Sequence, residues 1–187
     1  SGRKVGLETG NPCDFAGYDD LYAAFMKQVH YFVDMKVRVS NYIDRMFAKY
    51  APATFLSLFI DDCIAKGRDY YNCGPRYNTT YIQCTGLGTI TDSLSSLKKH
   101  VFEDKRFSMD EMLKAMADNF AGAEVMRQTI LNRTPFFGND DEYADAIAVK
   151  VFDDLYDAIE GKPNTKGECF HLNMLSTTCH VYFGKVL

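Results

Sequence analysis

Two cysteine and histidine pairs near the carboxyl end are the residues best suited to hold a metal ion. Cys169 and His171 lie two residues apart, and Cys179 and His180 are adjacent. Structural zinc sites usually place cysteines about two to four residues apart on tight turns. The sequence contains no Cys-x-x-Cys pattern. We therefore expect packed thiols and no metal site, with a zinc-binding domain as the alternative.

Two further cysteines flank a segment that could make a thiol nucleophilic. Cys73 and Cys84 lie on either side of Arg76 and Tyr77, and a nearby arginine can lower the pKa of a thiol. Neither cysteine has a histidine or another base beside it in the sequence. A packed role is therefore favoured for both.

A glycine pair could bind phosphate. Gly86 and Gly88 precede a predicted helix, whose first backbone N–H groups are free to bind an anion. The dinucleotide-binding pattern needs a third glycine three residues later, where Thr91 stands. A tight turn between strand and helix is the favoured interpretation.

Two groups of carboxylates could perform acid–base chemistry or bind a divalent cation. Asp61 and Asp62 follow a predicted strand, the position at which α/β proteins often place their sites. The second group lies in Asn139–Glu142. Acidic residues stabilise the amino end of a helix electrostatically, which already explains that second group.

A polar row is predicted in the last segment, Thr177–Phe183, which is rich in β-branched and aromatic residues and predicts a strand. Alternation places Thr178, His180 and Tyr182 on one face and apolar side chains on the other. This polar face either lines a solvated cavity or forms a hydrogen-bonded core layer. The cavity is favoured for Tyr182.

The elements that position these residues alternate between helix and strand. Apolar residues recur at helical spacing from Tyr18 to about Lys49, with a break in the stripe near Ser40–Asn41, which predicts one long helix or two. Thr54–Ile60 has the length and composition of a buried strand, and Thr79–Cys84 is a second strand. The glycine turn then leads into a helix over Thr91–Phe102.

Two capping boxes predict the later helices. Ser108–Glu111 opens a helix that runs to about Phe120, and Asn139–Glu142 opens one that runs to Gly161. Another helix is predicted near Glu124–Leu131. The pattern predicts an α/β fold with parallel strands. Three predicted strands are too few for a closed barrel, so we expect them to belong to a larger sheet.

Composition narrows the class of protein. Of the 187 residues, 47% are hydrophobic and 14% are aromatic, which suits one globular domain. The net charge is -4 and the basic residues are scattered, so a nucleic-acid surface is disfavoured. No apolar run approaches the roughly 20 residues that span a bilayer, and no signal peptide core follows the start. We expect a cytoplasmic protein with no membrane contact.

Several motifs, taken together and in order, resemble the glycyl radical enzymes of the pyruvate formate-lyase-like superfamily. They are Gly6–Gly10, Phe55–Ile64, Arg76–Gln83, Gly86–Leu94, Gly138–Asp141 with Tyr143–Asp145, and Thr177–Gly184. The matching stretch lies between the loop with the thiyl cysteine and the loop with the radical glycine. By this resemblance, residues 1–187 are a segment of a single barrel domain.

The resemblance implies a barrel of ten strands with outer helices. It also implies a protein glycyl radical, installed by a radical SAM activating enzyme, which generates a cysteine thiyl radical. A homodimer is expected for the parent protein, in the cytoplasm or inside a bacterial microcompartment. The Gly-Cys-Val-Glu and Arg-Val-Ala-Gly-Tyr loops are absent, so the segment alone is expected to be inactive and Cys84 is not the thiyl residue. The expected substrate contacts are Tyr182, His180, Thr178, Arg76 and Asn78.

Within the family, three stretches look most similar to choline trimethylamine-lyase: Asn72–Tyr77, Gln83–Gly86 and Pro163–Gly167. This similarity predicts cleavage of choline to trimethylamine and acetaldehyde by the parent enzyme. The alternative within the class is a dehydratase that acts on hydroxyproline, glycerol or propanediol. The alternative of another class is a stand-alone structural or zinc-binding domain.

Overall fold

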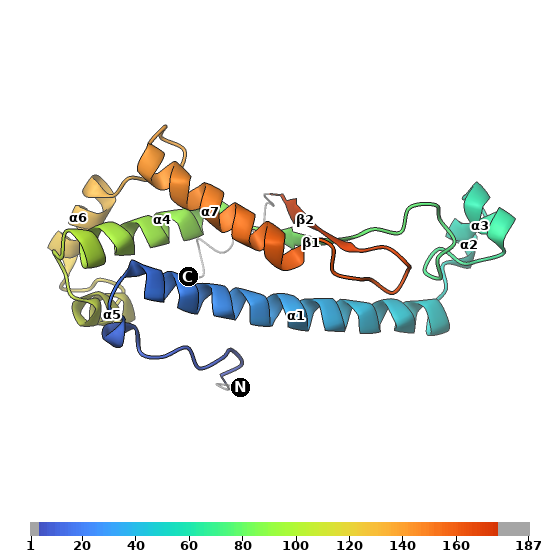
Figure 1. Cartoon of the computed structure of the whole chain (residues 1–187), viewed down its shortest axis with the longest axis horizontal. Helices are drawn as coiled ribbons and strands as arrows, with labels where there is room; N and C mark the ends of the chain where they lie inside the picture. The colour runs from blue at the N-terminus through green and yellow to red at the C-terminus, as the bar shows by residue number, and fades with distance from the viewer. Residues whose placement is uncertain (1–3, 176–187) are drawn as a thin grey trace. The chain divides into compact units, whose positions relative to one another are not determined.

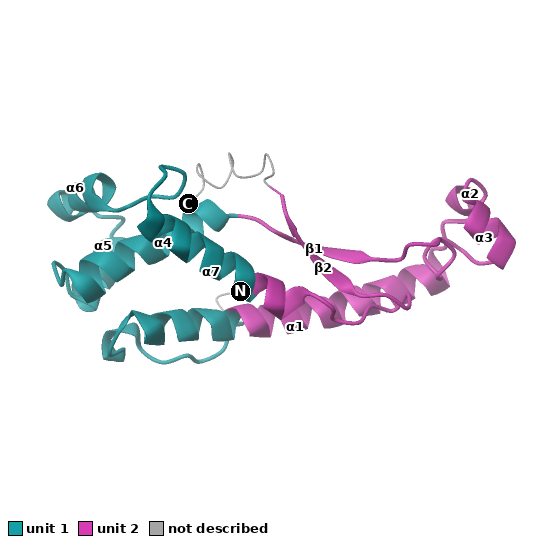
Figure 2. Cartoon of the chain, turned by 45° about the horizontal axis from the view of Figure 1, so that its top comes forward, with its two compact units in different colours: residues 1–28, 86–154 teal, residues 29–85, 155–187 magenta. Residues whose placement is uncertain are grey.

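The computed structural model describes residues 4–175, which form the helices and two strands of Figure 1. The helical elements are η1 (Pro12–Asp14), α1 (Tyr18–Tyr50), α2 (Thr54–Ser57), α3 (Asp61–Lys66), α4 (Leu87–Leu97), the π-helical segment η2 (Lys98–Glu103), α5 (Met109–Ala117), α6 (Glu124–Arg133) and α7 (Glu142–Ile159). The strands are β1 (Thr80–Cys84) and β2 (Phe170–Met174). The chain divides into two compact units, with boundaries near residues 28, 85 and 154 (Figure 2).

The predicted strand Thr79–Cys84 is confirmed as β1, and its partner β2 was not predicted. The two strands are parallel, and their register pairs Thr80 with Phe170 and Cys84 with Met174. The described segment is therefore mostly helical with one parallel pair. The ten-stranded barrel implied by the resemblance is not shown within residues 4–175.

One face of the strand pair is the core of the second unit. Ile82 of β1 and Phe170 of β2 pack with Val33 of α1 and Ile159 of α7. Phe170 and Ile159 have no solvent exposure. Helices therefore cover this face, and full burial of such side chains contributes about 1.5–3 kcal/mol each.

The end of α7 leads directly into the outer edge of β2. Gly161 has φ +75°, the left-handed conformation predicted for it, and its N–H donates to Phe170 O at 3.1 Å. The Phe170 N–H in turn donates to Lys162 O at 2.7 Å. The chain after α7 thus forms hydrogen bonds with the side of β2 that faces away from β1.

α1 is one helix rather than two, because the polar residues at its middle are directed away from their own backbone. The Asn41 side-chain amide donates to Pro163 O at 3.1 Å. An asparagine side chain that bonds elsewhere does not compete with the helical hydrogen bonds around it.

The prediction of a strand over Thr54–Ile60 was wrong. Residues 54–57 form α2, and the next turns close through Leu58 N–H to Phe55 O at 3.2 Å and Phe59 N–H to Leu56 O at 3.0 Å. A short apolar run has no period that separates strand from helix. Phe55, Leu58 and Phe59 are 75%, 63% and 71% exposed, so burial does not explain this run within the described residues.

The helices of the first unit follow their predicted caps only in part. The Ser108 capping box is present: Ser108 Oγ accepts from Glu111 N–H at 3.2 Å, and the Glu111 carboxylate accepts from Ser108 N–H at 2.8 Å. The box predicted at Asn139 was wrong, since Asp141 Oδ1 accepts from Tyr143 N–H at 2.9 Å instead. The core of this unit forms around Val101, Met109 and Met112, which α4, η2 and α5 bring together.

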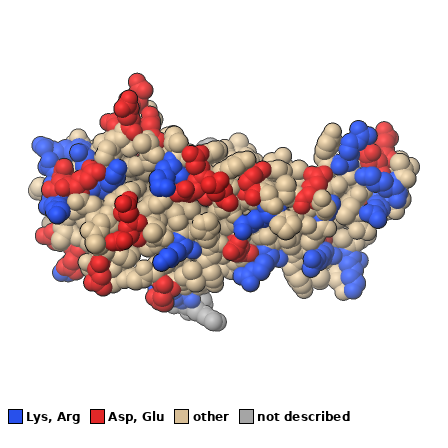
Figure 3. All heavy atoms as spheres, in the orientation of Figure 1, with Lys and Arg blue, Asp and Glu red and all other residues tan. Residues whose placement is uncertain are grey.

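The surface carries both signs of charge. On the face shown in Figure 3, basic and acidic side chains stand beside one another in both units. Among residues 4–175, no helix combines the length and the apolar character that crossing a membrane requires.

Candidate functional site on the open face of the strand pair

The face of the strand pair opposite the helices is polar. Alternation places Tyr81, Gln83, His171 and Asn173 there, because their neighbours Ile82, Phe170 and Leu172 pack toward the core. The register pairs Tyr81 with His171 and Gln83 with Asn173. The four side chains therefore form two adjacent rows, which we call the open face.

The open face is accessible and ordered by local contacts. Tyr81 is 59% exposed, and its ring lies 5.6 Å from the His171 ring. The Gln83 side-chain amide donates to Leu175 O at 3.1 Å, at the carboxyl end of both strands. Binding sites of α/β proteins lie at that end of a parallel sheet, so Gln83 and Asn173 are placed to contact a ligand.

His171 belongs to a three-residue cluster at the amino end of β2. Its Nδ1 is hydrogen-bonded to Glu160 Oε1, and its Nε2 lies 3.5 Å from Cys169 Sγ. Glu160 Oε2 also accepts from the Leu172 N–H at 3.3 Å. The carboxylate is thus held by a backbone group while it orients the imidazole.

Arg76 and Asn78 lie before β1, at the amino end of the strand pair. Arg76 donates to Asp62 Oδ1 at 3.3 Å, and its side chain is 70% exposed. Asn78 is bound more tightly: its amide donates to Pro75 O at 2.8 Å and its N–H to Glu168 Oε1 at 2.9 Å. The structure does not bring these two residues to the carboxyl end, where Gln83 and Asn173 lie.

Asn164 joins the loops that precede the two strands. Its side-chain amide donates to Asn78 O at 2.6 Å and to Thr80 Oγ1 at 3.1 Å. Its Oδ1 accepts from the N–H groups of Lys166 and Glu168 at 2.8 and 3.0 Å. One polar side chain therefore aligns β1 with the approach to β2.

The other sequence candidates have structural roles or were not described. Asp61 and Asp62 begin α3, so the prediction that they follow a strand was wrong. Burial raises the pKa of the Cys84 thiol, which opposes a nucleophilic role. The predicted strand Thr177–Phe183, with Thr178, His180 and Tyr182, lies outside the described residues.

No metal-binding group is formed by the residues that the structure describes. Within residues 4–175, no group of three or more His, Cys, Asp and Glu side chains is arranged so that it could hold a metal ion. Cys179 and His180, which the zinc alternative requires, lie outside this range. That alternative therefore stays a prediction without support from the described part.

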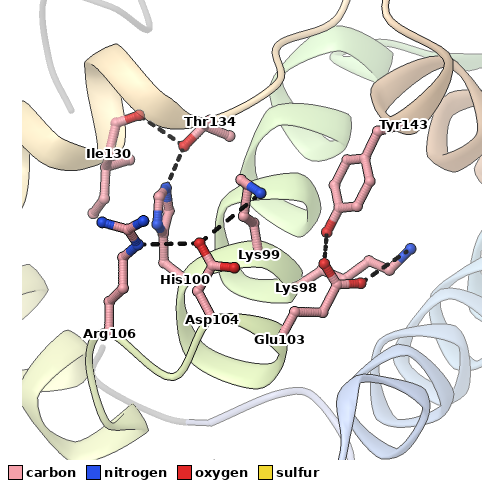
Figure 4. A network of polar contacts seen from close by, with 9 residues as sticks. All are labelled: Lys98, Lys99, His100, Glu103, Asp104, Arg106, Ile130, Thr134 and Tyr143. Atoms are coloured by element: carbon pink, nitrogen blue, oxygen red, sulfur yellow. Dashed lines mark hydrogen bonds and ion pairs between the residues drawn. The ribbon is translucent and has the colours of Figure 1, made fainter.

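A second polar network lies in the first unit, around the π-helical segment η2 (Figure 4). His100 is fully buried, and its Nε2 lies 3.0 Å from Thr134 Oγ1. The Thr134 hydroxyl donates to Ile130 O at 2.7 Å, so the hydrogen between His100 and Thr134 belongs to Nε2. Burial lowers the pKa of His100, and the positive charge of Arg106 lowers it further.

Around His100, charged residues form an outer ring. Asp104 accepts from Arg106 Nε at 3.0 Å, and Glu103 accepts from the Tyr143 hydroxyl at 2.9 Å. Burial and the Glu103 carboxylate raise the pKa of Tyr143 above its ordinary value. π-Helical turns are often found at functional sites, but here the side chains bind one another and hold η2 in place.

Comparison with known proteins defines the class. The pyruvate formate lyase-like family model matches residues 1–184, so the chain belongs to this family of glycyl radical enzymes. It is 46% identical to the trans-4-hydroxy-L-proline dehydratase of Clostridioides difficile, over all of this chain and 24% of that protein. The crystal structure of that dehydratase with its substrate bound matches with a TM-score of 0.91 over 97% of this chain.

Other relatives are more distant. The B12-independent glycerol dehydratase of Clostridium butyricum matches with a TM-score of 0.90 at 30% identity, covering 98% of this chain and 23% of that one. The (2S)-3-sulfopropanediol dehydratase of Klebsiella oxytoca is 31% identical over 98% of this chain and 22% of its own length. The chain thus spans about a quarter of the relatives it matches. These findings do not support the prediction of a choline trimethylamine-lyase.

Proposed function

We propose that this chain is a segment of a glycyl radical dehydratase that acts on trans-4-hydroxy-L-proline or a similar hydroxylated amino acid. The observation that supports it best is the 46% identity to the hydroxyproline dehydratase over the whole chain. Identity to the glycerol and sulfopropanediol dehydratases is 30% and 31% over nearly the same residues. The choline prediction rested on three short stretches, whereas the higher identity to the hydroxyproline dehydratase extends over the whole chain.

The segment's role in the parent enzyme is to supply barrel wall and outer helices. Helices cover one face of the strand pair. In a barrel with outer helices, the helix-covered face of each strand points outward. The open face with Tyr81, Gln83, His171 and Asn173 then points into the barrel. Hydroxyproline carries a carboxylate, an ammonium and a hydroxyl group, and polar side chains are the partners that such a ligand needs.

Substrate contacts are proposed for residues of the loop before β1 and of the last segment. Arg76 could pair with a carboxylate if the substrate displaced Asp62 from its exposed guanidinium. Tyr182, His180 and Thr178 are the other proposed contacts, with Asn78 as the residue that supports the Arg76 loop. The thiyl cysteine and the radical glycine are contributed by other parts of the parent polypeptide.

Exposed apolar residues of the second unit fit this role as a segment. Many of them lie on the second half of α1 and on α2 with the turns that follow it: Val39, Tyr42, Ile43, Met46, Phe47, Tyr50, Phe55, Leu56, Leu58 and Phe59. Adjacent apolar surface of this kind marks an interface. We propose that the remainder of the parent polypeptide covers it. The radical SAM activase, the homodimer and the cytoplasmic location belong to the same proposal.

The test uses the full-length polypeptide that carries this segment, activated under anaerobic conditions, with the glycyl radical quantified by electron paramagnetic resonance. Trans-4-hydroxy-L-proline, glycerol, propane-1,2-diol and choline are supplied in separate reactions. We expect loss of water from hydroxyproline at a kcat/KM at least about a hundredfold above the others, because a polar site rejects ligands that leave its groups unpaired. Trimethylamine release from choline at the higher rate would overturn the proposal.

A chimera tests whether this segment carries the specificity for hydroxyproline. Residues 1–187 replace the matching stretch of the Clostridioides difficile dehydratase, and the matched control receives the equivalent stretch of the glycerol dehydratase. We expect hydroxyproline turnover to persist in the first chimera and to fall at least about tenfold in the second. Equal losses in two folded, radical-bearing chimeras would show that the segment does not carry the specificity.

A further inference from the structure

The cluster of Glu160, His171 and Cys169 has the connectivity of an activated thiol. A carboxylate is bonded to one nitrogen of an imidazole, and the other nitrogen faces a sulfur atom at 3.5 Å. Proteins make a thiol reactive by placing a base within hydrogen-bond reach of it and by orienting that base with a third group. His171 also belongs to the open face, but none of the three residues is among the proposed substrate contacts.

The hydrogen bonds determine which nitrogen of His171 can act as the base. A carboxylate only accepts hydrogen bonds, so the proton on the neutral ring lies on Nδ1, toward Glu160. The Nε2 lone pair is then directed toward Cys169 Sγ and can accept the thiol proton. Glu160 is itself held by the Leu172 N–H, which limits its rotation.

The surroundings leave the sulfur accessible while they fix the ring. Cys169 is partly buried, and the His171 and Glu160 side chains keep 30% and 25% of their exposure. The Tyr81 ring lies at 5.6 Å from the imidazole and limits its movement on one side. The Glu160 carboxylate beside the ring disfavours an anionic reagent.

We propose that Cys169 is a modification site for small, uncharged electrophiles, with His171 as its base and Glu160 as a positioning residue. In the simplest reaction the sulfur attacks an electrophilic carbon. The S–C bond forms while the bond from carbon to the leaving group breaks, and the leaving group departs with the electron pair. The thiol proton moves to His171 Nε2, and the Glu160 carboxylate stabilises the charge on the ring.

The test measures alkylation by iodoacetamide in the full-length polypeptide before activation, so that it does not depend on the radical or on the substrate. Tandem mass spectrometry follows each cysteine separately over time. We expect Cys169 to react at least about tenfold faster than Cys13, an exposed cysteine that serves as the internal reference. Cys84, which packs against the core of the second unit and whose thiol pKa is raised by burial, should react more slowly than Cys13.

Variants separate activation from simple exposure. His171→Gln should lower the rate at Cys169 by about tenfold, and Glu160→Gln by about threefold, with the rate at Cys13 unchanged. His30→Gln, at an exposed histidine of α1, is the matched control and should change neither rate. Slow Cys84 labelling in each variant shows that the fold is intact.

Two results would overturn the proposal. One is a Cys169 rate equal to or below that of Cys13, which includes the case in which the parent polypeptide covers the thiol. The other is an unchanged Cys169 rate in Glu160→Gln and in His171→Gln. If His171→Gln unfolds and exposes every cysteine, the Cys169 rate in Glu160→Gln decides whether the proposal stands. This variant should keep the fold, since the glutamine can still accept the Leu172 hydrogen bond.

Discussion

His100 and His171 occupy similar networks in opposite environments. Each has one ring nitrogen bonded to an oxygen, but His100 is fully buried against a neutral hydroxyl, whereas His171 is partly exposed against a carboxylate. His100 Nδ1 is buried with no hydrogen-bond partner. Its environment therefore opposes a positive charge, whereas His171 has a carboxylate as its partner.

This difference separates a histidine that supports a fold from one that can perform chemistry. A proton on His100 would place a charge in a site without a second acceptor, at a large desolvation cost. The His171 ring instead lies beside the Glu160 carboxylate and is partly exposed to water. Both residues are histidines, so the difference between them comes from the groups that surround each ring.

The largest predicted effect is on the stability of the first unit. His100→Ala removes a side chain with no exposure and leaves a cavity beside η2, which we expect to cost about 2–4 kcal/mol. His171→Ala should cost less than about 1 kcal/mol, because water already reaches that ring. Hydrogen exchange of the α4 and β2 amides in the full-length polypeptide measures the two effects locally. Equal losses of stability in His100→Ala and His171→Ala would contradict the difference between the two histidines.

A smaller effect is expected from the partner of His100. Thr134→Val keeps the shape of the side chain but removes the oxygen that accepts from Nε2, so a buried N–H is left unpaired. We expect destabilisation by about 1–3 kcal/mol, detected as faster exchange in α4 and α6. Thr129→Val, at a partly exposed position of α6, is the control and should change exchange little.

Acid should weaken the first unit through His100. Its pKa in the fold is lowered by burial, so the unfolded chain binds the proton more readily. Stability from this group is therefore present above the ordinary histidine pKa of about 6.5 and is lost as the pH falls below it. Exchange of the η2 amides at pH 7.5 and 5.5 measures the loss. A variant His100→Gln, which cannot be protonated, should lose this dependence.

The smallest effect on stability is expected at Arg76. Its ion pair with Asp62 is exposed, so Arg76→Ala should change stability by less than about 0.5 kcal/mol. If Arg76 binds a substrate carboxylate as proposed, KM of the activated parent enzyme should rise at least about tenfold with little change in kcat. Arg68→Ala, at an exposed arginine between α3 and β1, is the control. An unchanged KM would remove Arg76 from the proposed contacts.

Part of the candidate site could have been found in the sequence. The alternation of Thr80 and Ile82 with Tyr81 and Gln83 is readable within Thr79–Cys84, and it predicts a polar face on β1. The same alternation predicts the polar row of Thr177–Phe183, which lies outside the described residues. β2 was missed because Phe170–Met174 follows a polar loop and mixes apolar with polar residues. Its partner strand lies about 90 residues earlier, as the bond between Asn78 and Glu168 shows.

The sequence alone determined the elements whose signals act over a few residues. The Ser108 box, the left-handed Gly161, β1 and the family motifs belong to this group, because caps, turns and local periodicity depend on near neighbours. Only the tertiary structure decided that β2 pairs with β1, and that Glu160, His171 and Cys169 meet. These contacts join the end of one helix to a strand beyond a loop, and no local pattern encodes that distance.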